Sequence, residues 1–180
     1  RVQTPAGTDF EVELGYKWIP CGGLIKKGEW KNLPEGEVFT CVKNIKEGYL
    51  VIDGVLGDYF DEKYGLLKEP VHISVKEGKI TGIQCENKAL EEDLKEYTKQ
   101  DENADRIGEF AIGTNTYLKK LIGNMLQDEK FPGVHVSIGH GYPQLTRVDW
   151  NSDAHCDCVM KDCTIFVDGT KIMGSGRLLI

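Results

Sequence analysis

The chain has 180 residues, of which 40% are hydrophobic, and this is enough to bury a core as one large domain or two small ones. Its 22 basic and 29 acidic residues give a formal net charge of −7 without a basic run, which argues against nucleic acid or an anionic membrane as a partner. The apolar stretches are too short to span a membrane, and residues 1–10 lack the apolar core of a signal peptide. We therefore expect a soluble, cytoplasmic protein. Because the sequence begins with Arg1 rather than Met, we also expect a part of a longer chain.

The first half of the chain predicts strands joined by turns. Residues 8–14 alternate apolar and acidic side chains, as a half-buried strand does. Pro and Gly residues between 15 and 36 indicate loops that lead into a strand opening at Glu37. A short strand at 49–52 and a hairpin of 71–75 with 79–83 follow.

The second half adds helices. In the segment 87–100, Leu90, Leu94 and Tyr97 recur at helical spacing behind Asn87, a residue that can cap a helix. A second helical piece is expected over 116–126.

Further strands follow the helical pattern. The apolar run 107–113 holds one acid, residues 134–138 form another strand candidate that ends at Gly139, and 165–172 predicts a hairpin with an Asp-Gly turn. Strands outnumber helices, so the fold class is α+β, a strand-rich mixed or antiparallel sheet domain with a few helices.

Six cysteines stand at 21, 41, 85, 156, 158 and 163, and without a secretory signal we expect reduced thiols. Three of them, Cys156, Cys158 and Cys163, are close enough in sequence to suggest zinc. A closed zinc site needs four ligands, however, and its paired cysteines usually lie two to four residues apart. Small buried side chains are the favoured interpretation of this cluster.

The segment from Trp150 to Cys158 carries the chemistry of the chain. If it is extended, His155 and Asp157 project from one face as an imidazole and a carboxylate, which are metal ligands. Upstream, Glu37, Glu109 and His135 sit among apolar or small neighbours, where an unpaired charge is costly. Each of these groups has an ordinary alternative. Glu37 could be a strand-edge acid and Glu109 part of a buried ion pair. His135 could be a core histidine with its hydrogen bonds made, and His155 with Asp157 a surface pair.

Four blocks of sequence resemble the leucyl aminopeptidase T family of two-metal exopeptidases, in the family's order and approximate spacing. They are Asn32 to Thr40, Gly108 to Asn115, His135 with Tyr142 seven residues later, and Asn151-Ser152-x-x-His155-x-Asp157.

The resemblance implies a dinuclear site for two divalent metal ions, with zinc, cobalt or magnesium as candidates. It assigns the ligands Glu37, Glu109, His135, Tyr142, His155 and Asp157. In the Asp128-Glu129 pair, Glu129 is the candidate general base and proton shuttle, while Tyr142 is a second candidate for a catalytic role, as an oxyanion stabiliser. No role is assigned to His140.

The implied activity is that of a metallo-aminopeptidase, in which a water activated by the two metals attacks the peptide bond after the N-terminal residue. The family has an amino-terminal α/β domain before its ligand-bearing domain and forms homodimers. Residues 1–180 would thus be a single catalytic domain, the C-terminal part of a two-domain chain that is a homodimer in its full-length form. Two alternatives stay open: an inactive metal-binding or assembly domain, and a metal-dependent amidohydrolase of a small metabolite.

Overall fold

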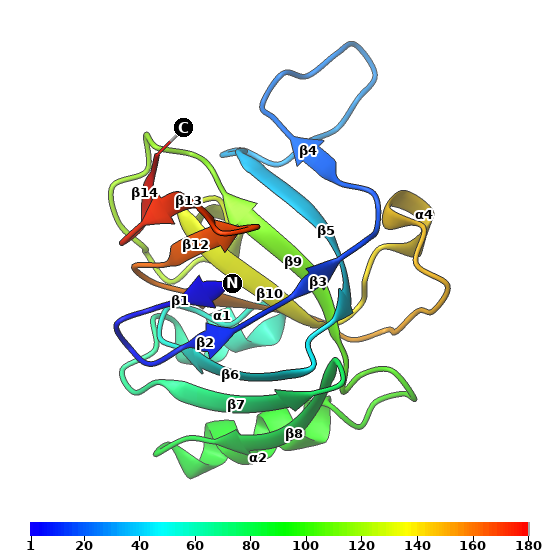
Figure 1. Ribbon diagram of the computed structural model, residues 1–180, viewed down its shortest axis with the longest axis vertical. Coiled ribbons are helices and arrows are strands. Elements are labelled where there is room, and N and C mark those ends of the chain that lie inside the picture. The colour runs from blue at the N-terminus through cyan, green and yellow to red at the C-terminus, as the bar shows by residue number, and fades with distance from the viewer. Residues whose placement is uncertain (180) are drawn as a thin grey trace.

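The computed structural model describes residues 1–179, which form two antiparallel sheets and four short helices (Figure 1). The larger sheet has the strand order β14-β13-β12-β1-β2-β6-β7-β8. Its strands are β1 (Val2–Gln3), β2 (Asp9–Phe10), β6 (Glu47–Ile52), β7 (Val71–Lys76), β8 (Lys79–Gln84), β12 (Thr164–Val167), β13 (Thr170–Gly174) and β14 (Arg177–Leu178). Strands dominate, which confirms the predicted α+β class.

The smaller sheet has the order β11-β10-β9-β5-β3, with β4 also paired to β5. Its strands are β3 (Glu13–Leu14), β4 (Ile19–Cys21), β5 (Glu37–Asn44), β9 (Ile107–Gly113), β10 (Gly133–Gly139) and β11 (His155–Met160). The long loop between β4 and β5 projects from the body of the molecule at the top of Figure 1.

Both predicted hairpins are present. The turn between β7 and β8 is Glu77-Gly78, and that between β12 and β13 is Asp168-Gly169. All four turn residues have positive φ, as a two-residue hairpin loop of this hand requires. His72 on β7 is half-buried and lies 2.8 Å from the Tyr49 hydroxyl, so it belongs to the surface of the larger sheet.

The expected strand over 8–14 is in fact two strands. Phe10 on β2 pairs with β6 in the larger sheet, whereas Leu14 on β3 pairs with β5 in the smaller one. The alternation of apolar residues was correct, but it spans a crossing from one sheet to the other at Glu11-Val12.

The helices are α1 (Tyr59–Tyr64), α2 (Lys88–Tyr97), α3 (Met125–Asp128) and α4 (Pro143–Thr146). Helix α2 confirms the helical prediction for 87–100, and the Asn87 side chain accepts hydrogen bonds from the backbone N–H groups of Ala89 and Leu90. The helix expected over 116–126 was wrong, since only α3 forms at its end.

The physical reason is that only Leu121 and Met125 of the expected apolar stripe pack against other apolar side chains, those of Val55 and Val159. Tyr117 is 88% exposed and Ile122 is 51% exposed. The Asp128 carboxylate instead accepts hydrogen bonds from the backbone N–H groups of Ile122 and Gly123, and Gly123 has a φ of 81°. This loop is therefore held by a side chain rather than by helical hydrogen bonds.

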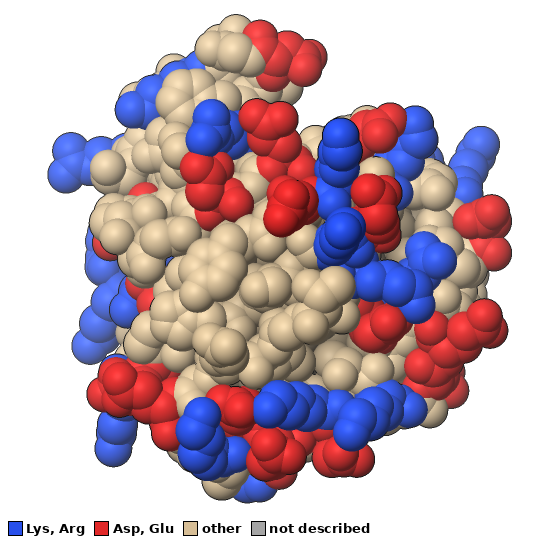
Figure 2. All heavy atoms as spheres, turned by 60° about the horizontal axis from the view of Figure 1, so that its bottom comes forward, with Lys and Arg blue, Asp and Glu red and all other residues tan. Residues whose placement is uncertain are grey.

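One continuous apolar core joins the two sheets and α2, with members such as Ile52, Ile73, Leu94 and Val136. No helix of residues 1–179 is long and apolar enough to cross a membrane. On the face drawn in Figure 2, acidic and basic side chains are interspersed around an uncharged central area.

Candidate metal centre

The register of the smaller sheet sends the polar side chains of β5, β9, β10 and β11 to one face. Residues directly opposite in an antiparallel ladder project to the same side. Glu109 lies opposite Cys41, and Asp157 lies opposite Ser137. His135 lies in the neighbouring row, opposite Ala111. The sheet therefore brings together acids and histidines that are far apart in the sequence.

Glu109, His155 and Asp157 form one compact group. Nε2 of His155 lies 3.2 Å from Oδ2 of Asp157 and 3.9 Å from Oε2 of Glu109. One potential ligand atom from each residue falls within 4.8 Å of the others. The expectation that His155 and Asp157 share a strand face directed at Glu109 is confirmed.

Glu37, Glu129 and His135 form a second group with the same mutual spacing, within 4.8 Å. Nε2 of His135 lies 3.5 Å from Oε2 of Glu37 and 3.9 Å from Oε1 of Glu109, so the two groups are neighbours. Together they hold four carboxylates and two imidazoles on one face of the sheet.

A buried lysine, which sequence reasoning missed, accompanies these acids. Lys130 is 1% exposed, and its Nζ lies 2.6 Å from Oε1 of Glu37 and 2.5 Å from Oε1 of Glu129. In the sequence it follows Asp128-Glu129 and looks like part of a charged surface turn. The one signal that could have found it is the adjacent apolar Phe131, which starts the return of the chain into the sheet.

The predicted Asp128-Glu129 pair has divided roles. Asp128 is fully buried and its carboxylate holds the 122–123 loop backbone, so its task is structural. Glu129 alone reaches the polar face. This agrees with the preference for Glu129 at the sequence level, although its role as a base stays a prediction.

Tyr142 lies at the edge of the first group. Its hydroxyl is 3.1 Å from Nε2 of His155, and its ring packs against Phe39 with 5.2 Å between ring centroids. Tyr142 has a φ of 54°, and its backbone N–H donates to Nδ1 of His140. The structure thus places Tyr142 in contact with the cluster and gives His140 the task of holding its backbone. Metal ligation by Tyr142 stays a prediction.

A second layer of hydrogen bonds fixes the strands that carry the cluster. The Ser137 hydroxyl accepts a bond from the backbone N–H of Glu109. The Tyr97 hydroxyl accepts one from the backbone N–H of His155 and donates to Asp58, and burial together with Asp58 raises the pKa of Tyr97. These contacts align β9 and β11 before any ligand binds.

The loops are fixed in the same way. Gly36 has a φ of 131°, and a Cβ there would lie 2.9 Å from Cβ of Asn115. The Asn115 side chain donates to the Glu35 carbonyl oxygen across this contact. Glycine at 36 therefore lets the loop before Glu37 lie directly against residue 115.

The clustered charges shift one another's protonation. Burial, followed by the charges of Asp157 and Glu37, raises the pKa of Glu109 well above its usual range. Burial and the Asp157 charge raise the pKa of Glu129 to about 8. Burial opposes ionisation of Asp157 as well, but the charge and hydrogen bond of His155 outweigh it and lower the Asp157 pKa to about 2.

The histidines respond in opposite directions. Burial lowers the pKa of His135, whereas at His155 the charge of Asp157 and its hydrogen bond overcome the effect of burial and raise the pKa. Burial, with the nearby charge of Glu109, also raises the pKa of the Tyr142 hydroxyl, which therefore keeps its proton at neutral pH.

The residues of the cluster fit divalent metal ions. The cluster holds more acidic than basic side chains. Within the described residues, Lys130 is the one lysine or arginine paired with its four carboxylates, which are those of Glu37, Glu109, Glu129 and Asp157. Oε2 of Glu37 and Oδ1 of Asp157 are buried without a hydrogen-bond partner among residues 1–179. Buried anionic oxygens without partners are costly, and cations bound between the carboxylates and imidazoles would satisfy them.

The cysteines outside this face are structural. Cys156 and Cys158 alternate with His155 and Asp157 along β11, and both belong to the apolar core with Cys163. All three are free thiols and 0% exposed. The interpretation of this cluster as small buried side chains is confirmed.

A third group of potential ligands was missed by sequence reasoning. Cys21, Glu35 and Glu37 bring one ligand atom each within 4.8 Å of one another. Cys21 lies opposite Glu37 in the β4–β5 ladder, and burial beside these acids raises the pKa of its thiol to about 11. Neither Cys21 nor Glu35 has a sequence context that marks it, because the pairing of β4 with β5 is what brings them together.

With this geometry established, comparison with known families becomes informative. The family model of thermophilic metalloproteases, M29, matches residues 1–180. The chain belongs to this family. The match confirms the resemblance drawn from the four sequence blocks, and the name metalloprotease implies that members of the family use a divalent metal ion.

Two solved structures share the fold. One is 2,5-dihydroxypyridine dioxygenase from Pseudomonas putida KT2440, with a TM-score of 0.74 and 22% identity, over 99% of this chain and 54% of that one. The other is wild-type AmpT from Thermus thermophilus, with a TM-score of 0.74 and 23% identity, over 99% of this chain and 49% of that one. The chain therefore spans about half the length of each. No curated protein gives a significant sequence match.

Proposed function

We propose that this chain carries the metal-binding catalytic site of an aminopeptidase that uses two divalent metal ions to remove N-terminal residues from peptides. The observation that supports this most is the pair of adjacent groups, Glu37 with Glu129 and His135, and Glu109 with His155 and Asp157. Each group offers carboxylate oxygens and one imidazole, the donors that zinc and related divalent ions accept.

The bound ions would supply Lewis acidity and lower the pKa of a coordinated water. The chain's own residues would hold and orient the reactants. Glu109 lies 3.9 Å from Nε2 of both histidines, so it is the carboxylate best placed to connect the two groups.

Proton transfer would fall to Glu129. A general base is most effective when its pKa lies near the working pH, and the pKa of Glu129 is raised to about 8 in the metal-free chain. Its Oε1 is paired with Lys130, which fixes the carboxylate in position. Tyr142, protonated and in contact with His155, would donate a hydrogen bond to the developing oxyanion.

The dioxygenase of the same fold gives a second candidate chemistry. His135, His155 and Asp157 are two histidines and one carboxylate, the ligand type of mononuclear iron oxygenases. The further acids Glu37, Glu109 and Glu129 favour two cations over one, because a single divalent ion would leave some of these buried carboxylates without a metal.

The test is elemental analysis combined with hydrolysis of leucine p-nitroanilide, with Zn²⁺, Co²⁺ or Mg²⁺ added. We expect at least two metal equivalents and turnover in the wild type. Asp157→Asn should lose turnover and at least one metal equivalent, and Asp153→Asn, an exposed acid in the preceding loop, should lose neither. Metal without turnover would favour a binding domain, turnover of small amides alone would favour an amidohydrolase, and one iron equivalent would favour the oxygenase.

A further inference from the structure

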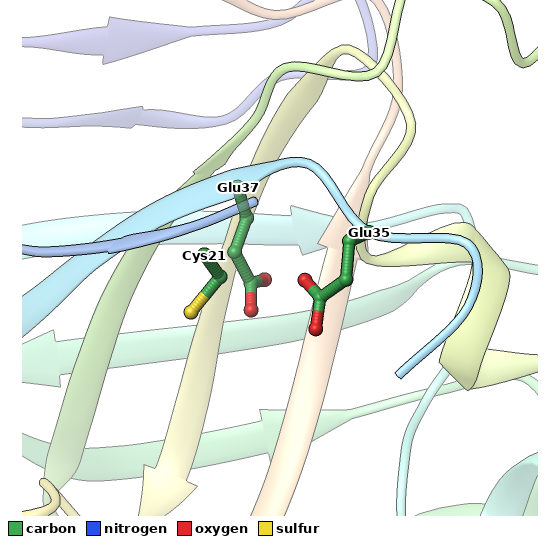
Figure 3. Close-up of side chains that lie close together, drawn as sticks. All are labelled: Cys21, Glu35 and Glu37. Carbon is green, nitrogen blue, oxygen red and sulfur yellow. The ribbon is translucent and has the colours of Figure 1, made fainter. Parts of the chain in front are cut away.

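The group of Cys21, Glu35 and Glu37 lies beside the proposed metal centre and has a different chemical character. Cys21 is the last residue of β4, Glu37 is the first residue of β5, and Glu35 belongs to the loop between them. Figure 3 shows the three side chains projecting in the same direction, with Glu37 between the other two. Sγ of Cys21 and one oxygen of each carboxylate lie within 4.8 Å of one another.

Two carboxylate oxygens of this group have no partner. Oε2 of Glu35 and Oε2 of Glu37 are both buried and make no hydrogen bond within residues 1–179. The Glu37 side chain is only 9% exposed, and Lys130 occupies its other oxygen, Oε1. A buried anionic oxygen without a donor is costly, so this geometry favours a positively charged ligand.

We propose that Cys21, Glu35 and Glu37 form a further cation site, selective for a thiophilic divalent ion such as Zn²⁺ or Cd²⁺. The thiol distinguishes it from the neighbouring centre, which has only oxygen and imidazole donors, because thiolate ligands select softer metals. As the sulfur–metal bond forms, the thiol releases its proton to solvent. Three protein ligands leave a fourth position of a tetrahedral ion open to water or a small ligand.

The two sites are linked through Glu37. This residue belongs to the group with Glu129 and His135 and also to the group with Cys21 and Glu35. An ion bound by Cys21 would draw the Glu37 carboxylate away from the neighbouring site or bridge to it. Excess zinc should therefore alter the affinity of the neighbouring site, while Mg²⁺, which prefers oxygen ligands, should not.

Titration with Co²⁺ tests the site directly, because a Co²⁺–thiolate bond gives a near-ultraviolet charge-transfer absorption that carboxylate and imidazole ligands do not. We expect this band in the wild type and its loss on addition of Zn²⁺ or Cd²⁺. Cys21→Ser should abolish the band. Removal of a residue that only supports a metal ligand typically lowers metal affinity by about 10- to 100-fold. Glu35→Gln removes a proposed ligand, so it should lower the affinity for the Co²⁺ ion that gives the band by at least about tenfold. Glu29→Gln, an exposed acid of the same loop, is the matched control and should change nothing.

A second measurement does not depend on how the variants fold. Cys21 is the one thiol of residues 1–179 that is not buried, so iodoacetamide at alkaline pH, where part of this thiol with its raised pKa is ionised, should modify it in the metal-free wild type, and Zn²⁺ should protect it. Three results would each contradict the proposed site. The wild type could bind Co²⁺ without the thiolate band, or the band could survive in Cys21→Ser. Alternatively, saturating zinc could leave the rate of Cys21 alkylation unchanged. Asp157→Asn should retain the band, so a failure of the aminopeptidase proposal can be told apart from a failure of this one.

Discussion

The two faces of strands β9, β10 and β11 carry opposite chemistry on alternate residues of the same segments. One face presents Glu109, His135 and Asp157. The other presents Phe110, Val136 and Cys158, which are buried in the core shared with the larger sheet. The difference shows how one sheet can separate stability from function, because side chains one position apart face opposite environments.

The largest expected effects come from neighbouring residues on the two faces. Phe110→Ala should reduce the free energy of unfolding by about 3–5 kcal/mol, since a 2% exposed ring that packs on Phe10 and Trp18 is removed. Glu109→Gln should keep or raise the stability of the metal-free chain, because it replaces a carboxyl whose ionisation burial and the charges of Asp157 and Glu37 oppose with a neutral amide of similar shape.

For metal affinity the order of the two variants should be reversed. Glu109→Gln should lose at least about tenfold in affinity, whereas the folded fraction of the Phe110→Ala protein should bind metal as the wild type does. Chemical denaturation and metal titration of the same preparations measure both quantities. If Glu109→Gln unfolds the chain while residual metal affinity stays intact, then Glu109 is a structural ion-pair residue and the separation of the faces fails.

Tyr142→Phe sharpens the assignment within the polar face. Loss of an oxyanion donor costs about 10²–10³ in kcat, and we expect a loss of that size here with metal content unchanged. The hydroxyl contacts only His155 in this cluster, so the fold should not depend on it. A parallel loss of bound metal would instead make Tyr142 a ligand, as the family resemblance implies.

The stability of the metal-free chain should depend on pH through the polar face alone. The folded-state pKa of Glu129 is raised to about 8 from an ordinary 4.5, so the folded state binds more protons than the unfolded state between these values. Stability should therefore fall as pH rises from about 4.5 to about 8. We expect a decrease on the order of 1–3 kcal/mol, less than an isolated carboxyl with this shift would give, because Glu129 titrates together with the neighbouring acids.

Thermal unfolding with a chelator across this pH range measures the decrease. Glu129→Gln should make the decrease smaller, with Glu109 and His155, whose pKa values are also raised, contributing the remainder, and Glu102→Gln, an exposed acid, should leave the profile unchanged. A wild-type stability that rises from pH 5 to 8 would contradict the repulsion at this face.

The separation of faces is also what made much of the site predictable from sequence. Alternation along 155–157 was enough to set His155 and Asp157 apart from the cysteines, because the period of a strand is local. The convergence of these residues with Glu37 and Glu109 depends on register, which the individual segments do not specify. It was inferred from the resemblance of four ordered blocks, and the strand pairing agrees with it.

What the sequence did not predict depends on contacts between distant segments. In the sequence Lys130 looks like a surface lysine. In the fold it is buried because it forms an ion pair with Glu37, which is 93 residues away in the chain. Cys21 and Glu35 become potential ligands of a common ion only because the pairing of β4 with β5 brings them next to Glu37. The expected helix over 116–126 failed for a related reason, because its apolar residues had helical spacing, yet Tyr117 and Ile122 found no core surface to cover.

The smallest expected effect comes from Lys119 in that same segment, which serves as the control outside both faces. Lys119 was expected on a charged helical face, yet it lies in an exposed loop, where its Nζ donates to the carbonyl oxygen of Thr116. Lys119→Gln should change the free energy of unfolding by no more than about 0.5 kcal/mol, as exposed substitutions generally do. Metal affinity should also stay the same, because the Lys119 side chain is exposed and its hydrogen bond lies within its own loop. Denaturant unfolding and a metal titration test both expectations. A loss of affinity comparable to that of Glu109→Gln would mean that this loop takes part in the centre, and the polar face would then extend beyond the sheet.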